Sequence, residues 1–318
     1  MKQVLILGGT GFVGRHVCEK LARQNIRATV LTRRQASARH VQMLPMVDLL
    51  EVRKLDSSTL APLLADHDAV INLVAILHGD EAAFEKVHVG LPTELVSACK
   101  ASGVRRIVHI SALGASPDSA SMYQRSKARG EAVLHESGLD VTLLRPSVVF
   151  GTEDKFLNTF ASLQKIFPVI PLACSQARFQ PVWVEDVASA VVRCLQDRST
   201  IGKTFEACGP EVFTLKQLVE LAGRYAGINH GQGRPVIGLP DVLGRLQARL
   251  MELAPGEPMM SRDNLAAMQT DNVASGTLPG LDALGITPSA LGAIAPSYLG
   301  AQGLRSCLMA KRKTAGRF

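Results

Sequence analysis

The first two dozen residues contain the pattern that most constrains the fold of this chain. A strand-sized apolar run at 4–7 leads directly into seven residues with G-x-x-G-x-x-G spacing: Gly8, Gly9, Thr10, Gly11, Phe12, Val13 and Gly14. Behind the glycines, Val13, Val17 and Leu21 recur at helical spacing over residues 12–22. A continuous apolar run is typical of a strand that is buried on both faces of a parallel sheet. The opening of the chain therefore predicts a strand, a tight turn and a helix.

The same alternation continues through the first half of the chain. Strand-like segments follow at 28–31, 47–52, 69–75, 107–111 and 141–144, and helix-like segments lie at 57–64, 84–101 and 123–136. Pro92 should kink the helix over 84–101 or open a new turn there. Strand–helix alternation with short connections predicts an α/β fold, a Rossmann-type doubly wound parallel sheet.

The second half of the chain is less regular. Helices are expected at 156–166 and 215–226, a short strand leading into a helix at 182–195, and a strand at 204–207. We expect residues 1–150 to form the Rossmann core. Residues 151–318 are expected to complete the sheet at about 180–208 and to form a smaller C-terminal lobe.

Composition limits the classes of protein to consider. The 318 residues are 47% hydrophobic and 20% charged, which is globular, and no apolar run approaches the ~20 residues of a membrane span. We find no targeting peptide. The six cysteines form no C-x-x-C pair, so reduced thiols are expected and neither disulfides nor a metal site is predicted. These features favour a cytoplasmic protein.

The net charge of +7 is spread along the chain, with one cluster near the end at Lys311, Arg312, Lys313 and Arg317. This cluster is either a solvated tail or a contact with acidic lipid at the inner membrane or with a partner protein. Nucleic-acid binding is not expected, because aromatic residues make up 4% of the chain and do not alternate with basic ones.

The glycine motif predicts a dinucleotide site. The first glycine permits a tight turn, the second lets the backbone approach a pyrophosphate, and the last lets the helix pack on the strand. The helix N-terminus then offers unpaired N–H groups to the phosphates. The alternative is a glycine-rich turn without function, but the position between a buried strand and a helix favours the site. Residues 1–150 are thus expected to be an NAD(P)-binding core.

The end of the second strand indicates which dinucleotide is bound. Sites for NAD place a carboxylate there, which accepts from the ribose 2′-OH. Here the strand ends with Thr32, Arg33 and Arg34, and two guanidinium groups could hold a 2′-phosphate. We therefore favour NADP(H) over NAD(H). Asp56 could accept from the adenine amino group or cap the helix over 57–64, and the two roles are compatible.

A second motif, Y-x-x-x-K, is formed by Tyr123 and Lys127 on the helix that follows the fifth strand. Residues i and i+4 share a helix face, so both side chains could point at one bound cofactor. A nearby ammonium favours the phenolate, so we expect a lowered Tyr123 pKa and a usable general acid/base.

Taken together, the chain resembles the extended short-chain dehydrogenase/reductase superfamily. It is most similar to the atypical branch that contains the nucleotide-binding accessory subunit of mitochondrial complex I (alpha subcomplex subunit nine) and its bacterial relatives. The matching stretches are GGTGFVGRHV (8–17), HISALGA (109–115), YQRSKARGE (123–131), LRPSVVFGTEDKFLN (144–158), QPVWVEDVASA (180–190) and MSRDNLAAMQTDNV (260–273).

The resemblance also implies a degraded catalytic centre. The superfamily places a Ser or Thr at the end of the fifth strand beside the Tyr, and here Ala112 occupies that slot while Ser111 is one residue early. The superfamily's Asn in the preceding helix is replaced by His88. Loss of one such donor typically costs ~10²–10³ in rate. Further cofactor contacts are expected at the ends of the fourth and fifth strands and after the sixth: Leu73, Val74, Ala75, Ser111, Pro146 and Val148.

Three functions remain open from the sequence. The first is an NADP(H)-binding structural or assembly protein that acts with respiratory complex I or quinone-biosynthesis proteins. The second is an active oxidoreductase, or a sugar-nucleotide epimerase or dehydratase, that uses Tyr123 and Lys127. The third, a redox-sensing regulator, is disfavoured because such proteins usually lack Y-x-x-x-K.

Overall fold

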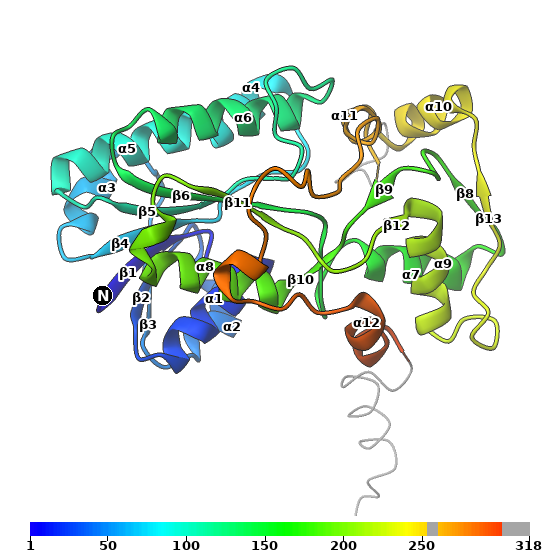
Figure 1. The fold of residues 1–318 in the computed structure, drawn as a ribbon, viewed down its shortest axis with the longest axis horizontal. Coiled ribbons are helices and arrows are strands. Elements are labelled where there is room, and N and C mark those ends of the chain that lie inside the picture. Colours follow the sequence, from blue (N-terminus) through cyan, green and yellow to red (C-terminus); the bar gives the residue numbers. More distant parts are fainter. Residues whose placement is uncertain (253–259, 301–318) are drawn as a thin grey trace, which may run out of the picture. The chain divides into compact units, whose positions relative to one another are not determined.

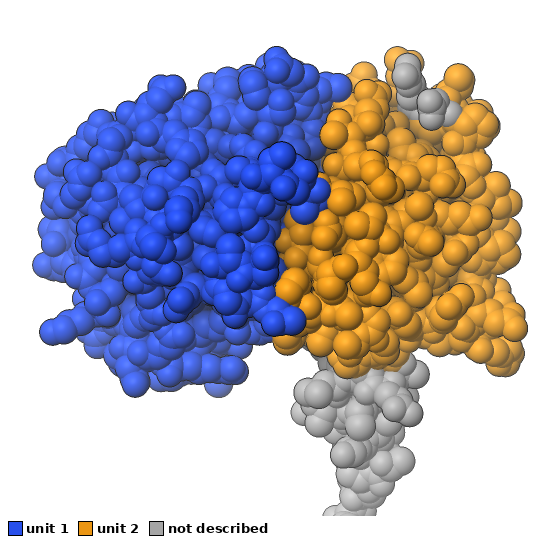
Figure 2. Space-filling model, viewed as in Figure 1, with its two compact units in different colours: residues 1–146, 184–207, 274–287 blue, residues 147–183, 208–273, 288–318 orange. Residues whose placement is uncertain are grey.

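The computed structural model describes residues 1–252 and 260–300. The chain divides into two compact units, which Figure 2 shows in different colours. Unit 1 contains residues 1–146, 184–207 and 274–287, and unit 2 contains residues 147–183, 208–273 and 288–318. Each unit is built from three separate stretches of chain, so neither is a simple N- or C-terminal half.

Unit 1 is built on a seven-stranded parallel sheet with the order β11-β6-β5-β4-β1-β2-β3. The strands are β1 (Gln3–Leu7), β2 (Arg27–Thr32), β3 (Val47–Glu51), β4 (Ala69–Asn72), β5 (Arg106–Ile110), β6 (Asp140–Pro146) and β11 (Thr204–Ala207). The strand order reverses on either side of β1, where β4 and β2 are its two neighbours. In open α/β sheets such a switch point is where ligands bind, beyond the carboxyl ends of the strands. The Rossmann-type α/β fold predicted from the sequence is confirmed.

Helices cover both faces of this sheet (Figure 1). They are α1 (Phe12–Arg23), α2 (Arg39–Gln42), α3 (Ser57–Leu64), α4 (Glu81–Glu85), α5 (Leu91–Ser102), α6 (Met122–His135) and α8 (Val184–Gln196). Helices α3 and α5 pack together over one face, where Leu5, Leu7, Leu60, Leu95 and Ile107 belong to one buried cluster. Helices α1 and α8 pack against each other, and α8 also contacts β5 and β6. Both faces of the central strands β1 and β4 are thus buried, which explains their apolar sequences, whereas the edge strand β3 is half-buried or exposed throughout.

Two boundaries near the carboxyl edge of the sheet differ from the sequence expectation. The strand expected at 69–75 ends at Asn72, because the Asn72 side-chain oxygen accepts from the Val74 N–H at 3.2 Å and turns the chain. The helix expected over 84–101 is divided into α4, a π-helical turn at Lys86–Gly90 and α5. Pro92 lies in the first turn of α5, so the prediction that it opens a new turn is confirmed.

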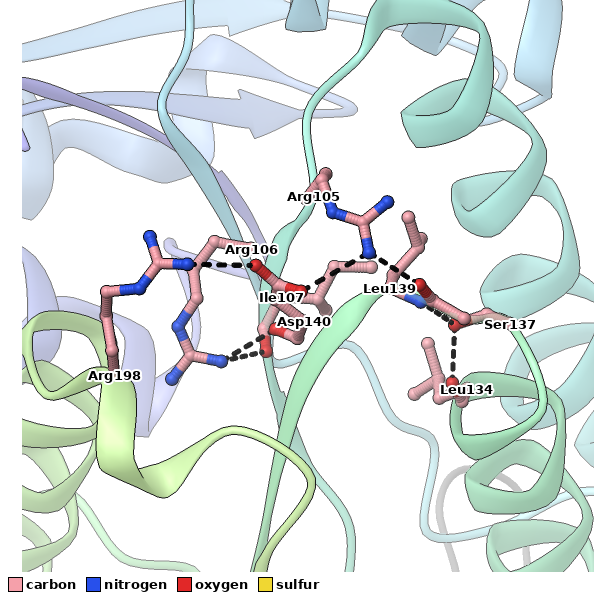
Figure 3. Close-up of polar contacts among 9 residues, drawn as sticks. Arg105, Arg106, Ile107, Leu134, Ser137, Leu139, Asp140 and Arg198 are labelled. Atoms are coloured by element: carbon pink, nitrogen blue, oxygen red, sulfur yellow. Dashed lines mark hydrogen bonds and ion pairs between the residues drawn. The ribbon is translucent and has the colours of Figure 1, made fainter.

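At the opposite edge of the sheet, a polar network joins β5, β6 and the end of α8. Buried Arg106 donates to the carbonyls of Ile107 and Asp140 at 3.3 and 2.7 Å. Figure 3 shows Asp140 between Arg105 and Arg198, which approach its two carboxylate oxygens at 3.4 and 3.8 Å. The network lies away from the carboxyl ends of the strands, so its role is structural.

Unit 2 contains three short strand pairs and five helices among its described residues. The pairs are β7 (Val149–Phe150) with β10 (Val182–Trp183), β9 (Arg178–Phe179) with β12 (Phe213–Thr214), and β8 (Ile170–Leu172) with β13 (Val236–Gly238). The helices are α7 (Leu157–Ile166), α9 (Leu215–Tyr225), α10 (Asp241–Glu252), α11 (Arg262–Ala267) and α12 (Leu291–Leu299). The remaining short elements all belong to unit 1. They are three 3-10 helices, η1 (Gln35–Ala38), η3 (Arg198–Thr200) and η4 (Asp282–Leu284), and the π-helical turn at Lys86–Gly90.

Buried Asp154 organises the most distinctive motif of unit 2. Its carboxylate accepts from the backbone N–H groups of Gly151, Phe156 and Asn158 and from the Tyr298 hydroxyl at 2.8 Å. The Asp of the R-P-S-V-V-F-G-x-x-D segment therefore fixes the loop that leads into α7. Across the described parts of both units, no helix has the length and apolar character needed to cross a bilayer. The basic cluster at 311–317 lies outside the described residues.

Candidate functional site

The glycine motif forms a tight turn between β1 and α1. Gly8 has φ +81°, a conformation that favours glycine, and its carbonyl accepts from the Gly11 N–H at 3.0 Å. A Cβ at Gly14 would lie 2.4 Å from the Gly8 oxygen, and a Cβ at Gly9 would lie 2.8 Å from a Val30 methyl. These two glycines are thus required for helix α1 to approach the turn and for the turn to pack on β2.

The N-terminus of α1 has no side-chain cap. Gly11 occupies the N-cap position and has no side-chain oxygen to offer the first N–H groups of the helix. A Cβ at Gly11 would meet the Gly8 oxygen at 3.2 Å. Uncapped N–H groups and the positive end of the helix dipole are the elements from which phosphate sites are built. The predicted phosphate-binding residues are thus brought together in one loop.

The residues that follow β4 lie against this turn. A Cβ at Gly8 would be 3.0 Å from the Leu73 carbonyl carbon, and the Leu73 N–H donates to the Leu7 carbonyl at 2.9 Å. Leu73 and Val74 therefore lie beside the glycine loop at the switch point, and the contact expected from Ala75 stays a prediction. The Asn72 amide nitrogen is buried with no hydrogen-bond partner among the described residues, so this edge has an unused donor.

Arg33 and Arg34 follow β2 and are both exposed. The Thr32 hydroxyl donates to the Arg34 carbonyl at 3.1 Å, which orders the turn on which the arginines lie. Two further groups here were not found from the sequence. His40 Nε2 lies 3.1 Å from the Thr10 carbonyl, and the Glu51 carboxylate accepts from the Gln35 N–H at 3.1 Å. Neither contact could be predicted from the sequence, because each joins residues that are distant in the chain and belong to no common motif.

Asp56 caps helix α3. Its carboxylate accepts from the Thr59 N–H and the Ser58 hydroxyl, both at 2.9 Å, and these hydrogen bonds lower the pKa of Asp56. The capping role weighed in the sequence is therefore observed. The adenine contact stays a prediction, and the half-buried position of Asp56 is compatible with it.

Tyr123 and Lys127 lie one turn apart on α6. The Lys127 ammonium donates to the Ile110 carbonyl at 2.9 Å, at the end of β5. Lys127 is 2% exposed, and burial lowers the pKa of its ammonium to about 8, although nearby Glu131 opposes the change. Burial also raises the pKa of Tyr123 to about 12. The expected lowering of the Tyr123 pKa is thus wrong for the protein without ligand, because desolvation of the phenolate dominates.

Ser111 and Ala112 follow β5, where the resemblance expects a catalytic hydroxyl. Ser111 is 3% exposed, and its hydroxyl oxygen has no hydrogen-bond partner among the described residues. Its backbone N–H donates to the Leu144 carbonyl at 2.8 Å, so the residue extends the β5–β6 pairing. Ala112 is the next residue, and its place in the hydroxyl slot stays a prediction. Pro146, at the end of β6, accepts from the Leu113 N–H at 2.9 Å, and Val148 belongs to unit 2.

Acidic and histidine side chains also meet between α1 and α8. Ligand atoms of His16, Glu19 and Glu185 lie within 4.8 Å of one another. Glu185 already accepts from His16 at 2.5 Å and pairs with Lys20 at 2.8 Å. A neighbouring ammonium competes with a cation for this carboxylate, so the cluster is explained as an interhelical contact.

Comparisons with known proteins identify the family of this chain. The family described as "NAD dependent epimerase/dehydratase family" matches residues 4–208, which include all seven strands of the sheet except Gln3 of β1 and do not include residues 274–287 of unit 1. The chain therefore belongs to the NAD-dependent epimerase/dehydratase family of extended short-chain dehydrogenase/reductases.

Within this family, the chain is related to accessory subunits of complex I. It is 32% identical over 293 residues to "NADH dehydrogenase (ubiquinone) 1 alpha subcomplex subunit 9, mitochondrial" of Mus musculus, covering 90% of this chain and 76% of the relative. It is 28% identical over 300 residues to "NADH-ubiquinone oxidoreductase 40 kDa subunit, mitochondrial" of Neurospora crassa, covering 92% and 78%.

A solved structure has the same fold. The NADPH-dependent quinone oxidoreductase QOR2 of Escherichia coli, complexed with NADPH, superposes with a TM-score of 0.74 at 19% identity, covering 93% of this chain and 99% of that one. At this identity the likeness concerns the fold alone.

Proposed function

We propose that this protein binds NADP(H) at the glycine loop as a structural ligand, in preference to NAD(H), and acts in the structure or assembly of respiratory complex I or with quinone-biosynthesis proteins. The observation that supports the proposal is a glycine loop with an uncapped helix N-terminus in the same sheet as an unbonded Ser111 hydroxyl. Gly8, Gly11 and the N-terminus of α1 would form the phosphate cradle. Ala112 follows Ser111 where the resemblance expects a hydroxyl, and the Ser111 hydroxyl has no hydrogen-bond partner among the described residues.

The preference for NADP(H) follows from charge. Arg33 and Arg34 are exposed directly after β2, at the position where the ribose 2′-substituent of a dinucleotide lies in Rossmann sites. A 2′-phosphate there would gain charge-assisted, bidentate hydrogen bonds from the arginines. The 2′-OH of NAD(H), in contrast, would find no carboxylate at the end of β2 to accept its hydrogen bond. The Glu51 carboxylate on the neighbouring strand is engaged by the Gln35 N–H.

The partner proposal rests on the relatives, whose names describe them as subunits of NADH dehydrogenase. An accessory subunit needs a folded nucleotide domain but no turnover. We therefore place the protein in contact with complex I, peripheral to the inner membrane, with the dinucleotide as part of its folded state. Pull-down from gently solubilised membranes, with and without NADPH, tests the partner: recovery of complex I subunits supports it, and recovery of none contradicts it.

Cofactor choice is tested by Arg33→Glu. We expect NADPH affinity to fall at least about tenfold and NADH affinity to change little, because a charge-assisted hydrogen bond is worth ~1.5–3 kcal/mol. Arg27→Glu is the matched control, since Arg27 is exposed at the other end of the same strand. Titration by intrinsic fluorescence or calorimetry gives the dissociation constants of both cofactors for the wild type and the two variants. Equal weakening of both cofactors by Arg33→Glu would contradict a phosphate-reading role.

The second candidate, an active oxidoreductase or epimerase/dehydratase, is favoured by one observation, the Tyr123 and Lys127 pair on one face of α6. Under the first proposal, bound NADPH is not oxidised by quinones or sugar nucleotides, and Ala112→Ser raises any trace activity by restoring a donor. Robust turnover by the wild-type protein that Tyr123→Phe abolishes would replace the structural function with the enzymatic one.

A further inference from the structure

We propose that His88 is a positioning residue whose imidazole, held in one protonation state, fastens the loop after β4 to helix α6 and so shapes the nicotinamide half of the site. This inference rests on the proposed dinucleotide binding. It gives a role to His88, which stands where the superfamily has an Asn. His88 is 2% exposed and lies in the π-helical turn between α4 and α5. Such turns often occur where a helix must aim one side chain at a functional site.

The hydrogen bonds around His88 are satisfied by a single arrangement of protons. His88 Nε2 lies 3.2 Å from the Ile76 backbone nitrogen, which can only donate, so Nε2 is the acceptor. The Ser126 hydroxyl donates to the Tyr123 carbonyl at 2.8 Å, which leaves its oxygen free to accept. His88 Nδ1 lies 2.8 Å from that oxygen and must therefore carry the ring proton. The chain of bonds runs from the Ile76 N–H through the ring and Ser126 to Tyr123.

The rings around His88 also hold Tyr123. The His88 ring stacks on Phe84 with centroids 5.6 Å apart and an interplanar angle of 24°. The Tyr123 ring meets His88 edge-on at 5.4 Å and meets Phe84 at 5.9 Å. The His88 imidazole thus packs against α4 and α6 and accepts a hydrogen bond from the loop that follows β4. The relative positions of these three segments depend on it.

The surroundings keep this imidazole neutral. Burial and the nearby Lys127 ammonium lower the pKa of His88 to about 3. His109 on β5 faces the same ammonium and has a pKa well below its usual range for the same reasons. With both ring nitrogens bonded and no protonated form near neutral pH, His88 has no free position from which to pass a proton. It orients other groups instead.

The role predicts an effect on one half of the dinucleotide. The glycine loop follows β1 and the two arginines follow β2, whereas His88 acts on Ile76, Ser126 and Tyr123, beyond β4 and β5. A change at His88 should therefore weaken the binding of NADPH and spare that of adenosine 2′,5′-bisphosphate, which has the adenine, the 2′-phosphate and the 5′-phosphate but no nicotinamide.

The test uses His88→Phe, which keeps a ring and removes both hydrogen bonds, and His88→Gln, which can still donate and accept. We expect His88→Phe to weaken NADPH about tenfold or more, since a buried N–H loses its acceptor, and to leave adenosine 2′,5′-bisphosphate affinity unchanged. His88→Gln should restore part of the NADPH affinity. His67→Phe is the matched control, because His67 also bonds through its ring, to Thr29 at 2.8 Å, but lies before β4.

The outcomes separate this inference from the proposed function. Unchanged NADPH affinity in His88→Phe, or equal loss of both ligands, would overturn the positioning role. Failure of the wild-type protein to bind either ligand would overturn the proposed dinucleotide binding instead. Nitrogen-15 NMR of the wild-type protein decides the proton arrangement independently of any variant. A neutral ring protonated at Nδ1 at pH 5 supports it, and an imidazolium or an Nε2-protonated ring overturns it.

Discussion

Lys127 is a cation held where water barely reaches it. Its ammonium has the Ile110 carbonyl as a neutral acceptor, and Glu131, one turn further along α6, is bonded through both carboxylate oxygens to Arg145. Burial is the main reason that the pKa of Lys127 falls to about 8. The folded protein without ligand therefore carries a cost that a bound dinucleotide could offset by offering hydroxyl acceptors.

We expect Lys127→Met to stabilise the ligand-free protein by about 1–3 kcal/mol, since the pKa depression corresponds to a cost of this order. Urea unfolding measures the change, and Lys100→Met, at an exposed position, should have little effect.

The lowered pKa of Lys127 also predicts how the stability of the wild-type protein depends on pH. Between about pH 8 and 10.5 the unfolded chain binds the Lys127 proton and the folded chain does not, so wild-type stability should rise with pH in this window. Lys127→Met should remove that rise, and a less stable Met variant would contradict the interpretation.

Among the elements, helices α1 and α8 are joined through one carboxylate. Glu185, in the first turn of α8, accepts from His16 at 2.5 Å and from Lys20 at 2.8 Å, both on α1. The His16 hydrogen bond is the main reason that the pKa of Glu185 falls to about 2. Because α1 begins at the glycine loop, this contact also fixes the helix on which the phosphate cradle depends.

The Glu185 contact should be lost in acid. Its contribution is fully present above the unfolded-state pKa near 4.5 and disappears as pH falls toward 2. We expect Glu185→Gln to cost about 1–2 kcal/mol at pH 7 and almost nothing near pH 2.5, measured by urea unfolding at each pH. Glu19→Gln is the control, because Glu19 reaches Arg15 only at 3.9 Å. A cost that is independent of pH would show that the ionised pair is not the source.

The network in Figure 3 contains a buried and an exposed arginine that are adjacent in sequence. Arg106 is 7% exposed and also donates to Thr142 and Thr200, at 2.8 and 3.0 Å, and to the Cys194 carbonyl. We expect Arg106→Met to destabilise the protein by about 2–4 kcal/mol, because several buried acceptors lose their donor at once. Arg105→Met should cost under about 1 kcal/mol, since the Arg105 side chain is 59% exposed. Equal effects in thermal unfolding would contradict this.

The elements also explain what the sequence could and could not predict. Strands such as β1 and β5 were predictable because each contains a short run of β-branched or other apolar residues at a regular interval between helical segments. The strands β7, β10, β9 and β12 each have two residues, too few to show a period of two, so their pairings had no sequence signal. The glycine loop and the Tyr123–Lys127 pair follow from local spacing. The raised Tyr123 pKa, the His40–Thr10 contact and the His88 hydrogen bonds depend on tertiary neighbours, which spacing does not specify.

For the whole molecule, the late segment 274–287 completes unit 1. The Glu206 N–H on edge strand β11 donates to the Pro279 carbonyl at 2.9 Å, and the Glu206 carboxylate accepts from the Ser275 N–H and hydroxyl. Leu281 and Leu284 of the same segment are 2% and 5% exposed. The segment therefore covers the outer edge of β11 and adds apolar contacts to the unit.

Replacing residues 274–287 with a Gly/Ser linker of equal length should expose this edge. Two buried leucines are lost, at about 1.5–3 kcal/mol each, and unpaired backbone groups become available to other chains. We expect lower thermal stability and soluble aggregates in size-exclusion chromatography with light scattering. Replacing only the exposed residues Ser275–Thr277 with Gly/Ser should lower the melting temperature less and cause less aggregation. A linker variant that stays monomeric with an unchanged melting temperature would contradict the covering role.

The three-part composition of unit 1 also has a consequence for synthesis on the ribosome. Strand β11 is complete at Ala207, but the segment that covers it ends at Thr287, about 80 residues later. At translation rates of about 5–20 residues per second, the nascent chain presents an open sheet edge for on the order of ten seconds. About half of unit 2, residues 208–273, emerges during this interval, so β12 and β13 are made while a free parallel edge is exposed on the same chain. Correct folding thus depends on order in time as well as on sequence, and slow translation of residues 208–287 should increase the demand for chaperones.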